Sequence, residues 1–313
     1  MTSAELPKRI LVAVDAEGLA ANAFLQGAAL ARRLGSKLCL VHAVHIPASL
    51  WPGLAESEFS ELRRTALDHA RRSALERLDE ARAGVDPGAL PEQPLDGLLE
   101  VADGHPARVI LERAEHFRAD LIVLGHHKKR PLFDFGSTAR AILSRIHVPV
   151  WIQPEAVTPI RRILVPIDFS EHSRRALDHA RALALRLGAG LRLLHCYAPP
   201  AFAYSSGADG VPGPTYVIDR DRDAAREELQ RWLRGLERYE LQIESVFTEG
   251  ESALEIVRES APDDLIVMGT HGRGIARRFL LGSVAERVVR RSPAPVLTLH
   301  GPSGTSRRST RRT

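Results

Sequence analysis

The sequence has few cysteines and no long apolar run, and each absence excludes a class of protein. Cys39 and Cys196 are the two cysteines among 313 residues. Two cysteines cannot form a disulfide framework or a CxxC zinc site, which indicates a reducing compartment. No stretch approaches the roughly 18 apolar residues that a membrane-spanning helix needs, and Met1–Lys8 lacks the apolar core of a signal peptide. We therefore expect a cytoplasmic protein without a membrane partner.

Excess charge of one sign is absent from the body of the chain. The formal net charge is +4, from 43 basic and 39 acidic residues. The segment Pro302–Thr313 holds four of the arginines and no acid, so that the rest has 39 basic residues (43 less 4) against 39 acidic ones. Such a tail can contact phosphates, but it is more often simply solvated. The composition thus disfavours nucleic acid as a partner and predicts a disordered basic tail over residues 302–313.

The chain contains one internal repeat. Arg9–Asp15 recurs as Arg162–Asp168, 153 residues later, and Asp120–Gly125 recurs as Asp264–Gly269, at an offset of 144. A period near 150 is that of a duplicated domain, because the units of a solenoid have about 20–50 residues. We therefore predict two tandem domains, and the sequence places them at residues 5–153 and 160–301.

Each copy alternates short apolar runs with amphipathic patterns, as strands and helices do in an α/β protein. In the second copy we expect these elements, in order: strand Ile163–Ile167, helix from the cap at Ser170 to about Leu187, strand Leu191–Tyr197, helix Asp219–Arg238, strand Leu241–Phe247, helix Ser252–Ser260, strand Leu265–Met268, helix Ser283–Arg290 and strand Val296–Leu299. Fully apolar strands that alternate with helices favour a parallel sheet covered on both faces. The predicted fold class is α/β, with two doubly wound domains.

The last strand of each copy is predicted to lie at a sheet edge. Pro149 and Pro295 open these strands, at Val148–Ile152 and Val296–Leu299. Proline cannot donate a hydrogen bond to a neighbouring strand, and an unprotected edge pairs readily with another edge. We therefore predict that the two final strands meet, so that the chain forms an internal pseudo-dimer. Association of the pseudo-dimer into a further homodimer is left open.

The second copy has a glycine-rich segment that is suited to binding an anion. Gly269 ends the fourth predicted strand, Gly272 follows, and nine residues later Gly282 and Ser283 open a helix. Glycines allow the backbone to approach a ligand closely, and the start of a helix offers free N–H groups and the positive end of its dipole. Asp168 ends the first strand at the same edge, where ligands of open α/β sheets bind. Because the sequence has no Gly-Lys pair and no third glycine, it matches neither a Walker loop nor the dinucleotide fingerprint.

The spacing Gly269-x2-Gly272-x9-Gly282-Ser283 resembles the nucleotide-binding signature of the universal stress protein family. The resemblance extends to both copies, over about Lys8–Leu299. It implies a five-stranded parallel sheet of order 3-2-1-4-5 in each domain, with the domains paired through their fifth strands. It also implies that the chain binds ATP, or AMP or ADP, with a magnesium or manganese ion on the phosphates and no metal site made by the protein.

The same resemblance assigns a nucleotide site to the second copy, formed by Pro166, Ile167, Asp168, Cys196, Met268, Gly269, His271, Gly272, Gly282, Ser283 and Val284. By analogy, Asp168 would contact the adenosine end, and the backbone of Cys196 would contact the base. Gly282, Ser283 and Val284 would hold the phosphates. For His271 the sequence leaves a phosphate contact and no contact equally open.

The first copy departs from this pattern, because Lys128 replaces the second glycine and the loop is shorter. The basic residues Lys128–Arg130 either compensate by their charge or form a solvated turn on a degenerate copy, and we favour the second interpretation. We therefore predict a weaker second site at Asp15, Gly125, Lys128, Gly136 and Ser137.

Three further residues are weighed against a functional role. His42 and His195 occupy the same position of the repeat, and we expect both to pack or to bond to the backbone. The thiol of Cys196 is either redox-sensitive or inert, and inert is favoured.

No general base or arginine finger is recognisable. The leading hypothesis is a nucleotide-binding stress-response protein that acts as sensor or adaptor. The alternatives are a slow ATPase or phosphotransferase at the same site, and a scaffold without nucleotide.

Overall fold

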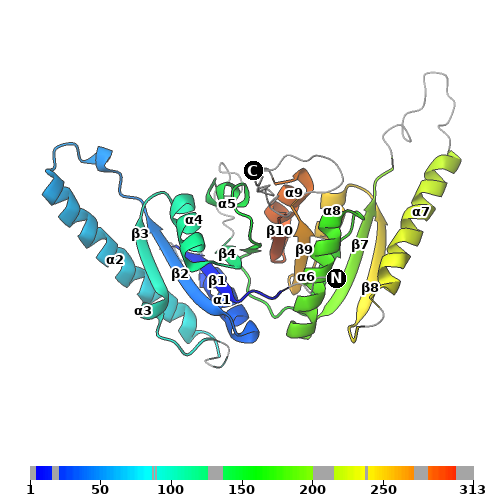
Figure 1. The fold of residues 1–313 in the computed structure, drawn as a ribbon, viewed down its shortest axis with the longest axis horizontal. Coiled ribbons are helices and arrows are strands. Elements are labelled where there is room, and N and C mark those ends of the chain that lie inside the picture. Colours follow the sequence, from blue (N-terminus) through cyan, green and yellow to red (C-terminus); the bar gives the residue numbers. More distant parts are fainter. Residues whose placement is uncertain are drawn as a thin grey trace, which may run out of the picture.

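The chain folds into two α/β domains that share one continuous sheet (Figure 1). The structure is a computed structural model that describes residues 5–15, 21–86, 88, 90–125, 137–199, 215–236, 239–270 and 281–300. The predicted tail over 302–313 lies outside these ranges. Within them, none of the helices combines the length and the apolar character that a bilayer crossing demands.

The elements alternate as the sequence predicts. The first domain contains β1 (Arg9–Val14), α1 (Ala21–Leu34), β2 (Lys37–Val44), the 3-10 turn η1 (Ala48–Leu50), α2 (Glu56–Ala83), α3 (Leu95–Leu98), β3 (Leu99–Asp103), α4 (Pro106–Phe117), β4 (Leu121–Gly125), α5 (Ser137–Leu143) and β5 (Val150–Gln153). The second contains β6 (Arg162–Pro166), α6 (Glu171–Leu187), β7 (Gly190–Tyr197), α7 (Thr215–Arg234), β8 (Ile243–Glu249), α8 (Ser252–Arg258), β9 (Asp264–Gly269), α9 (Ser283–Arg291) and β10 (Val296–Leu299).

The strand order is β3-β2-β1-β4-β5-β10-β9-β6-β7-β8. Each domain therefore has the order 3-2-1-4-5, and the two domains join through β5 and β10, as expected. Neighbouring strands are parallel within each domain, whereas β10 and β5 are antiparallel. The predicted fold class and the internal pseudo-dimer are confirmed.

Several predicted boundaries are wrong by two to four residues. Helix α7 begins at Thr215 and ends at Arg234, not at Asp219 and Arg238, and Gly235, a poor helix former, follows its end. Strand β8 runs to Glu249 because this polar residue still pairs with Tyr197. The shifts arise because pairing with a neighbour, and not apolar content, defines where a strand ends.

Local signals fix helix α6. The Ser170 side chain accepts a hydrogen bond from the Ser173 amide at 3.2 Å, and Gly188 ends the helix in the left-handed region with φ 67. Such caps satisfy the free backbone groups at both ends of a helix. The apolar face of α6 packs on the sheet, which brings the start of the helix, and the residues before it, to the carboxyl ends of the strands.

Two apolar clusters cover the two faces of the sheet. Helices α1, α2, α6 and α7 contribute to one cluster, and α4, α5, α8 and α9 contribute to the other. Each cluster draws side chains from both domains. Burial of the seam between β5 and β10 is therefore continuous with the domain cores.

Candidate functional site

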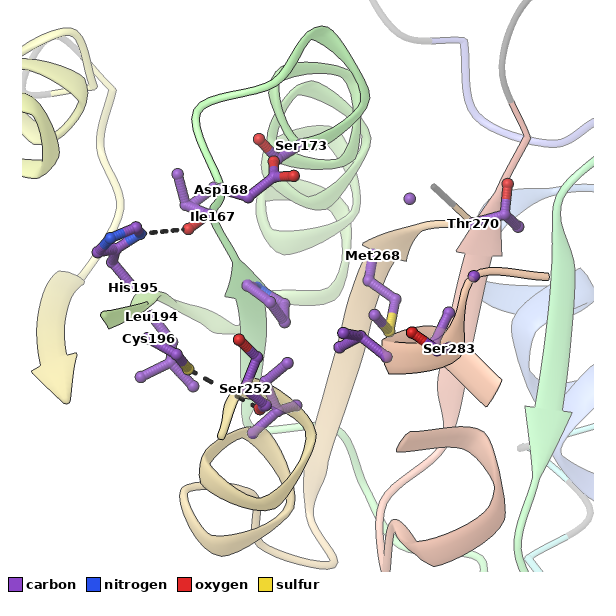
Figure 2. A pocket seen from close by; sticks show the side chains of 16 residues that line it. Ile167, Asp168, Ser173, Leu194, His195, Cys196, Ser252, Met268, Thr270 and Ser283 are labelled. Atoms are coloured by element: carbon purple, nitrogen blue, oxygen red, sulfur yellow. Dashed lines mark hydrogen bonds between the residues drawn. The ribbon is translucent and has the colours of Figure 1, made fainter. Parts of the chain in front are cut away.

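A cavity of about 360 Å³ opens at the carboxyl ends of β6, β7 and β9 (Figure 2). The starts of α8 and α9 close it on one face of the sheet. Strand β6 lies between β7 and β9, and the chain leaves β6 through α6 on the opposite face from α8 and α9. This is the point where the strand order reverses, which is where open α/β sheets bind their ligands.

The cavity brings together most of the residues that the sequence assigns to the second-copy site. Nine of the eleven line it: Pro166, Ile167, Asp168, Cys196, Met268, Gly269, Gly282, Ser283 and Val284. The other two, His271 and Gly272, lie outside the described residues. The nucleotide-binding roles of all eleven stay predictions.

Asp168 is held by the turn that follows β6. Its Oδ1 accepts hydrogen bonds from the Ser170 amide at 3.0 Å and from the Ser170 hydroxyl at 2.6 Å. Phe169, between them, has φ 62, which is a strained value for a residue other than glycine. Its ring stacks on His195 with centroids 4.4 Å apart and meets Trp232 edge-on. Aromatic packing on the far side of the sheet thus holds the strained turn that presents Asp168 to the cavity.

His195 bonds to the backbone, as the sequence analysis expects. Its Nδ1 lies 2.6 Å from the carbonyl oxygen of Ile167, and Figure 2 shows the ring directed toward that carbonyl. In the first domain, Nδ1 of His42 makes the equivalent contact with Val14 at 3.0 Å. The histidines tie the end of the second strand to the end of the first in both domains.

Cys196 lies against the start of α8. Its Sγ is 3.9 Å from the carbonyl oxygen of Ser252, and burial raises the pKa of the thiol to about 11. A protonated thiol is a poor nucleophile. The geometry therefore supports the inert interpretation over a redox role.

The start of α9 is hydrogen-bonded to Thr270, the residue that follows β9, and Thr270 is in turn bonded to β10. The Gly282 amide donates to the Thr270 carbonyl at 2.8 Å, and the Thr270 amide donates to the Leu299 carbonyl at 3.0 Å. The first intrahelical hydrogen bond of α9 runs from Glu286 to Gly282. The amides between them precede this bond and, as at any helix start, have no partner within the helix. An anion at this edge would meet these amides and the Ser283 hydroxyl.

Seven lining residues do not belong to the predicted site, and of these His195 alone is discussed in the sequence analysis: Ser173, Leu194, His195, Ser252, Ile256, Thr270 and Ala285. Ser252 opens a predicted helix at the same edge, and this position could have pointed to it. Ile256 and Ala285 are ordinary apolar helix residues, and nothing in their local sequence distinguishes them from core positions.

A protein-built metal site is not evident. Among the described residues, no group of three or more His, Cys, Asp or Glu side chains is arranged to hold a metal ion.

The equivalent region of the first domain is described only in part. Asp15 follows β1, Gly125 ends β4 and Ser137 opens α5. Lys128 and Gly136 lie outside the described residues. Helix α5 has seven residues against nine in α9. The weaker second site stays a prediction.

Comparison with known proteins agrees with this architecture. The model of the universal stress protein family matches residues 7–154 and again residues 159–300. The chain belongs to the universal stress protein family. It is a tandem member: it is 27% identical over 296 residues to a universal stress protein of Mycobacterium tuberculosis, and the match covers 92% of this chain and 95% of that relative.

Shorter relatives match half of this tandem universal stress protein. One from Methanocaldococcus jannaschii is 31% identical over 147 residues, which is 45% of this chain and 83% of the relative. Among solved structures, a universal stress protein from Archaeoglobus fulgidus aligns with a TM-score of 0.59 and 18% identity, over 94% of this chain and 98% of that one. At this identity the likeness shows the fold.

Proposed function

We propose that this universal stress protein binds an adenine nucleotide, foremost ATP, in the cavity of the second domain and acts in the stress response as a sensor or adaptor. The observation that carries the proposal is the meeting of Asp168 with the start of α9 around one cavity. A carboxylate and the amides at the start of a helix are complementary to the two ends of a nucleotide. The same proposal places the protein in the cytoplasm, which cell fractionation tests.

The residues present fit such a ligand. The amides at the start of α9 and the Ser283 hydroxyl would hold the phosphates, and the Asp168 carboxylate would accept hydrogen bonds from ribose hydroxyls. Ile256, Met268 and Val284 supply apolar wall for the base. The volume of about 360 Å³ lies in the range of small-molecule pockets, about 300–1,000 Å³. A magnesium or manganese ion bound with the phosphates would neutralise part of their charge.

Isothermal titration calorimetry with MgATP tests the proposal through a matched pair of variants. Ser283→Glu places a carboxylate where the phosphates would bind, while an acidic residue at a helix start favours the helix itself. We expect Ser283→Glu to abolish measurable binding. The equivalent Ser137→Glu lies in the other domain and should leave MgATP affinity within about twofold, because salt screens a charge more than about 10 Å from the ligand. Unchanged binding in Ser283→Glu would overturn the proposal.

Native mass spectrometry and an ATP hydrolysis assay of the purified chain separate this function from the alternatives. Co-purified adenine nucleotide supports the sensor or adaptor. A chain that neither carries nor takes up nucleotide would be a scaffold. Steady ATP turnover that is lost in Ser283→Glu would favour the ATPase or phosphotransferase.

A further inference from the structure

The seam between the domains places equivalent residues of the two copies opposite each other. In the antiparallel pairing of β5 with β10, Trp151 lies opposite Leu297, and Ile152 lies opposite Val296. Trp151 and Leu297 occupy the same position of the repeat, 146 residues apart, the offset that also relates Pro149 to Pro295. The pseudo-twofold axis of the chain therefore passes through this pair.

In a symmetric homodimer, a residue on the twofold axis faces its own copy. Here the axial position is filled by one large and one smaller side chain, and both are buried, at 1% and 4% exposure. Two tryptophans at this position would overfill the space, and two leucines would leave a void, and both changes destabilise a packed interior. Trp151 opposite Leu297 avoids both outcomes.

A second axial pair lies on the other face of the sheet. Arg140 of α5 and Glu286 of α9 are also 146 residues apart, and Nη2 of Arg140 lies 2.8 Å from Oε1 of Glu286. Like-with-like pairing of the domains would place two arginines or two glutamates at this point. Opposite charges attract and like charges repel at such distances, so the axial position distinguishes the two arrangements.

The segment that connects the two domains is hydrogen-bonded to both of them. The Gln153 side chain donates to the Ala156 carbonyl at 2.7 Å, and the Thr158 hydroxyl donates to the Pro262 carbonyl at 2.6 Å. The Asn22 side chain of α1 bonds to the Glu155 carbonyl. A connection held in this way joins β5 to the second domain of its own chain.

We propose that the seam is a heterotypic recognition surface, whose partner is the other domain of the same chain. The face of the first domain around Trp151 and Arg140 fits Leu297 and Glu286, and rejects a second copy of itself. Each chain therefore pairs its own two domains with each other, and a like domain of a second copy does not fit the seam. The pairing at the seam does not depend on nucleotide binding.

Thermal unfolding of the full chain tests the proposal with three seam variants. Glu286→Arg with Leu297→Trp makes both sides resemble the first domain, and Arg140→Glu with Trp151→Leu makes both resemble the second. The third variant carries all four changes, which exchanges the two faces. We expect the first two to unfold about 5–10 °C below the unchanged chain, and the third to recover part of that loss, since contacting residues are coupled. Recovery is partial because the Trp151 indole donates a hydrogen bond to Gln153 at 2.9 Å, whereas the equivalent residue beside position 297 is Leu299.

A second set of variants changes only Arg140 and Glu286. These side chains are 52% and 31% exposed, so we expect the variants to fold even if those with changes at Trp151 or Leu297 do not. Arg140→Glu and Glu286→Arg should each lower the unfolding midpoint by about 2–4 °C at low salt. The double reversal should recover part of that loss, since Glu286 also pairs with Arg290 of α9 at 3.1 Å and that pair stays broken. Arg108→Glu, which breaks a pair within α4, is the control that no change at the seam rescues. Losses that simply add in both cycles would overturn the proposal.

Discussion

Replacing Asp168 by asparagine is expected to weaken nucleotide binding while the turn that carries it stays intact. In the structure, Oδ1 of Asp168 accepts hydrogen bonds from the Ser170 amide and hydroxyl at 3.0 and 2.6 Å. The amide oxygen of asparagine can accept the same bonds, so the local fold is retained. The second oxygen, however, is replaced by an NH₂ group, which cannot accept a hydrogen bond from a ribose hydroxyl.

The magnitude follows from the loss of one hydrogen bond to a charged group. Such a bond contributes about 1.5–3 kcal/mol, which corresponds to about a 10- to 150-fold increase in Kd. The equivalent Asp15→Asn in the first domain is the matched control, and its effect should stay within about twofold, because we assign the tighter site to the second domain.

Isothermal titration calorimetry with MgATP measures both variants, and thermal unfolding checks that the turn survives. Asp168→Asn should unfold within about 4 °C of the unchanged chain, the shift expected for the partial loss of a cap. Unchanged affinity in Asp168→Asn would refute the assigned role, and so would a larger loss in Asp15→Asn.

Three further predictions concern stability. The buried Asp264 carboxylate forms two 2.8 Å hydrogen bonds with the Arg162 guanidinium, so Arg162→Leu removes its cation and should lower the free energy of unfolding in urea by about 3 kcal/mol. The equivalent Arg9→Leu should lower it by less than about 1 kcal/mol, because the Asp120 carboxylate of the first domain is exposed and accepts hydrogen bonds from backbone amides. Burial raises the pKa of the Cys196 thiol from 9.0 to about 11, so between these values the folded state keeps a proton that the unfolded state releases. The free energy of unfolding should therefore fall as the pH rises from about 9 to 11, and Cys196→Ala should make that fall smaller. An identical pH profile in the variant would contradict the raised pKa. Gly188→Ala forces alanine to φ 67 in otherwise open space and should cost about 1 kcal/mol, and a neutral result would show that the helix end rearranges.

Most of the fold could be predicted because its signals are local or repeated. Ser170 and Gly188 bracket α6 with caps that are recognisable in the sequence, and the helix has these limits. Pro149 and Pro295 indicate that the last strands begin at sheet edges, and those strands form the seam. The end of α7 was less predictable, since the apolar stripe continues past Arg234 to the buried Leu236, although the helix has already ended.

The candidate site was predictable where glycines and an acid stand at strand ends. Apolar wall residues such as Ile256 were not, because their contact with the cavity depends on how α8 packs on the sheet. The Arg140–Glu286 pair was also beyond sequence reasoning. The two residues are far apart in the chain. They meet because of the register in which β5 pairs with β10, and the sequence does not reveal that register.

A crystal structure of the chain grown with MgATP would show whether the cavity of the second domain binds nucleotide. We expect nucleotide density in the second domain, with phosphates at the start of α9 and the ribose within hydrogen-bond distance of Asp168. Density at the first domain alone, or a cavity that stays without nucleotide at saturating concentration, would contradict it.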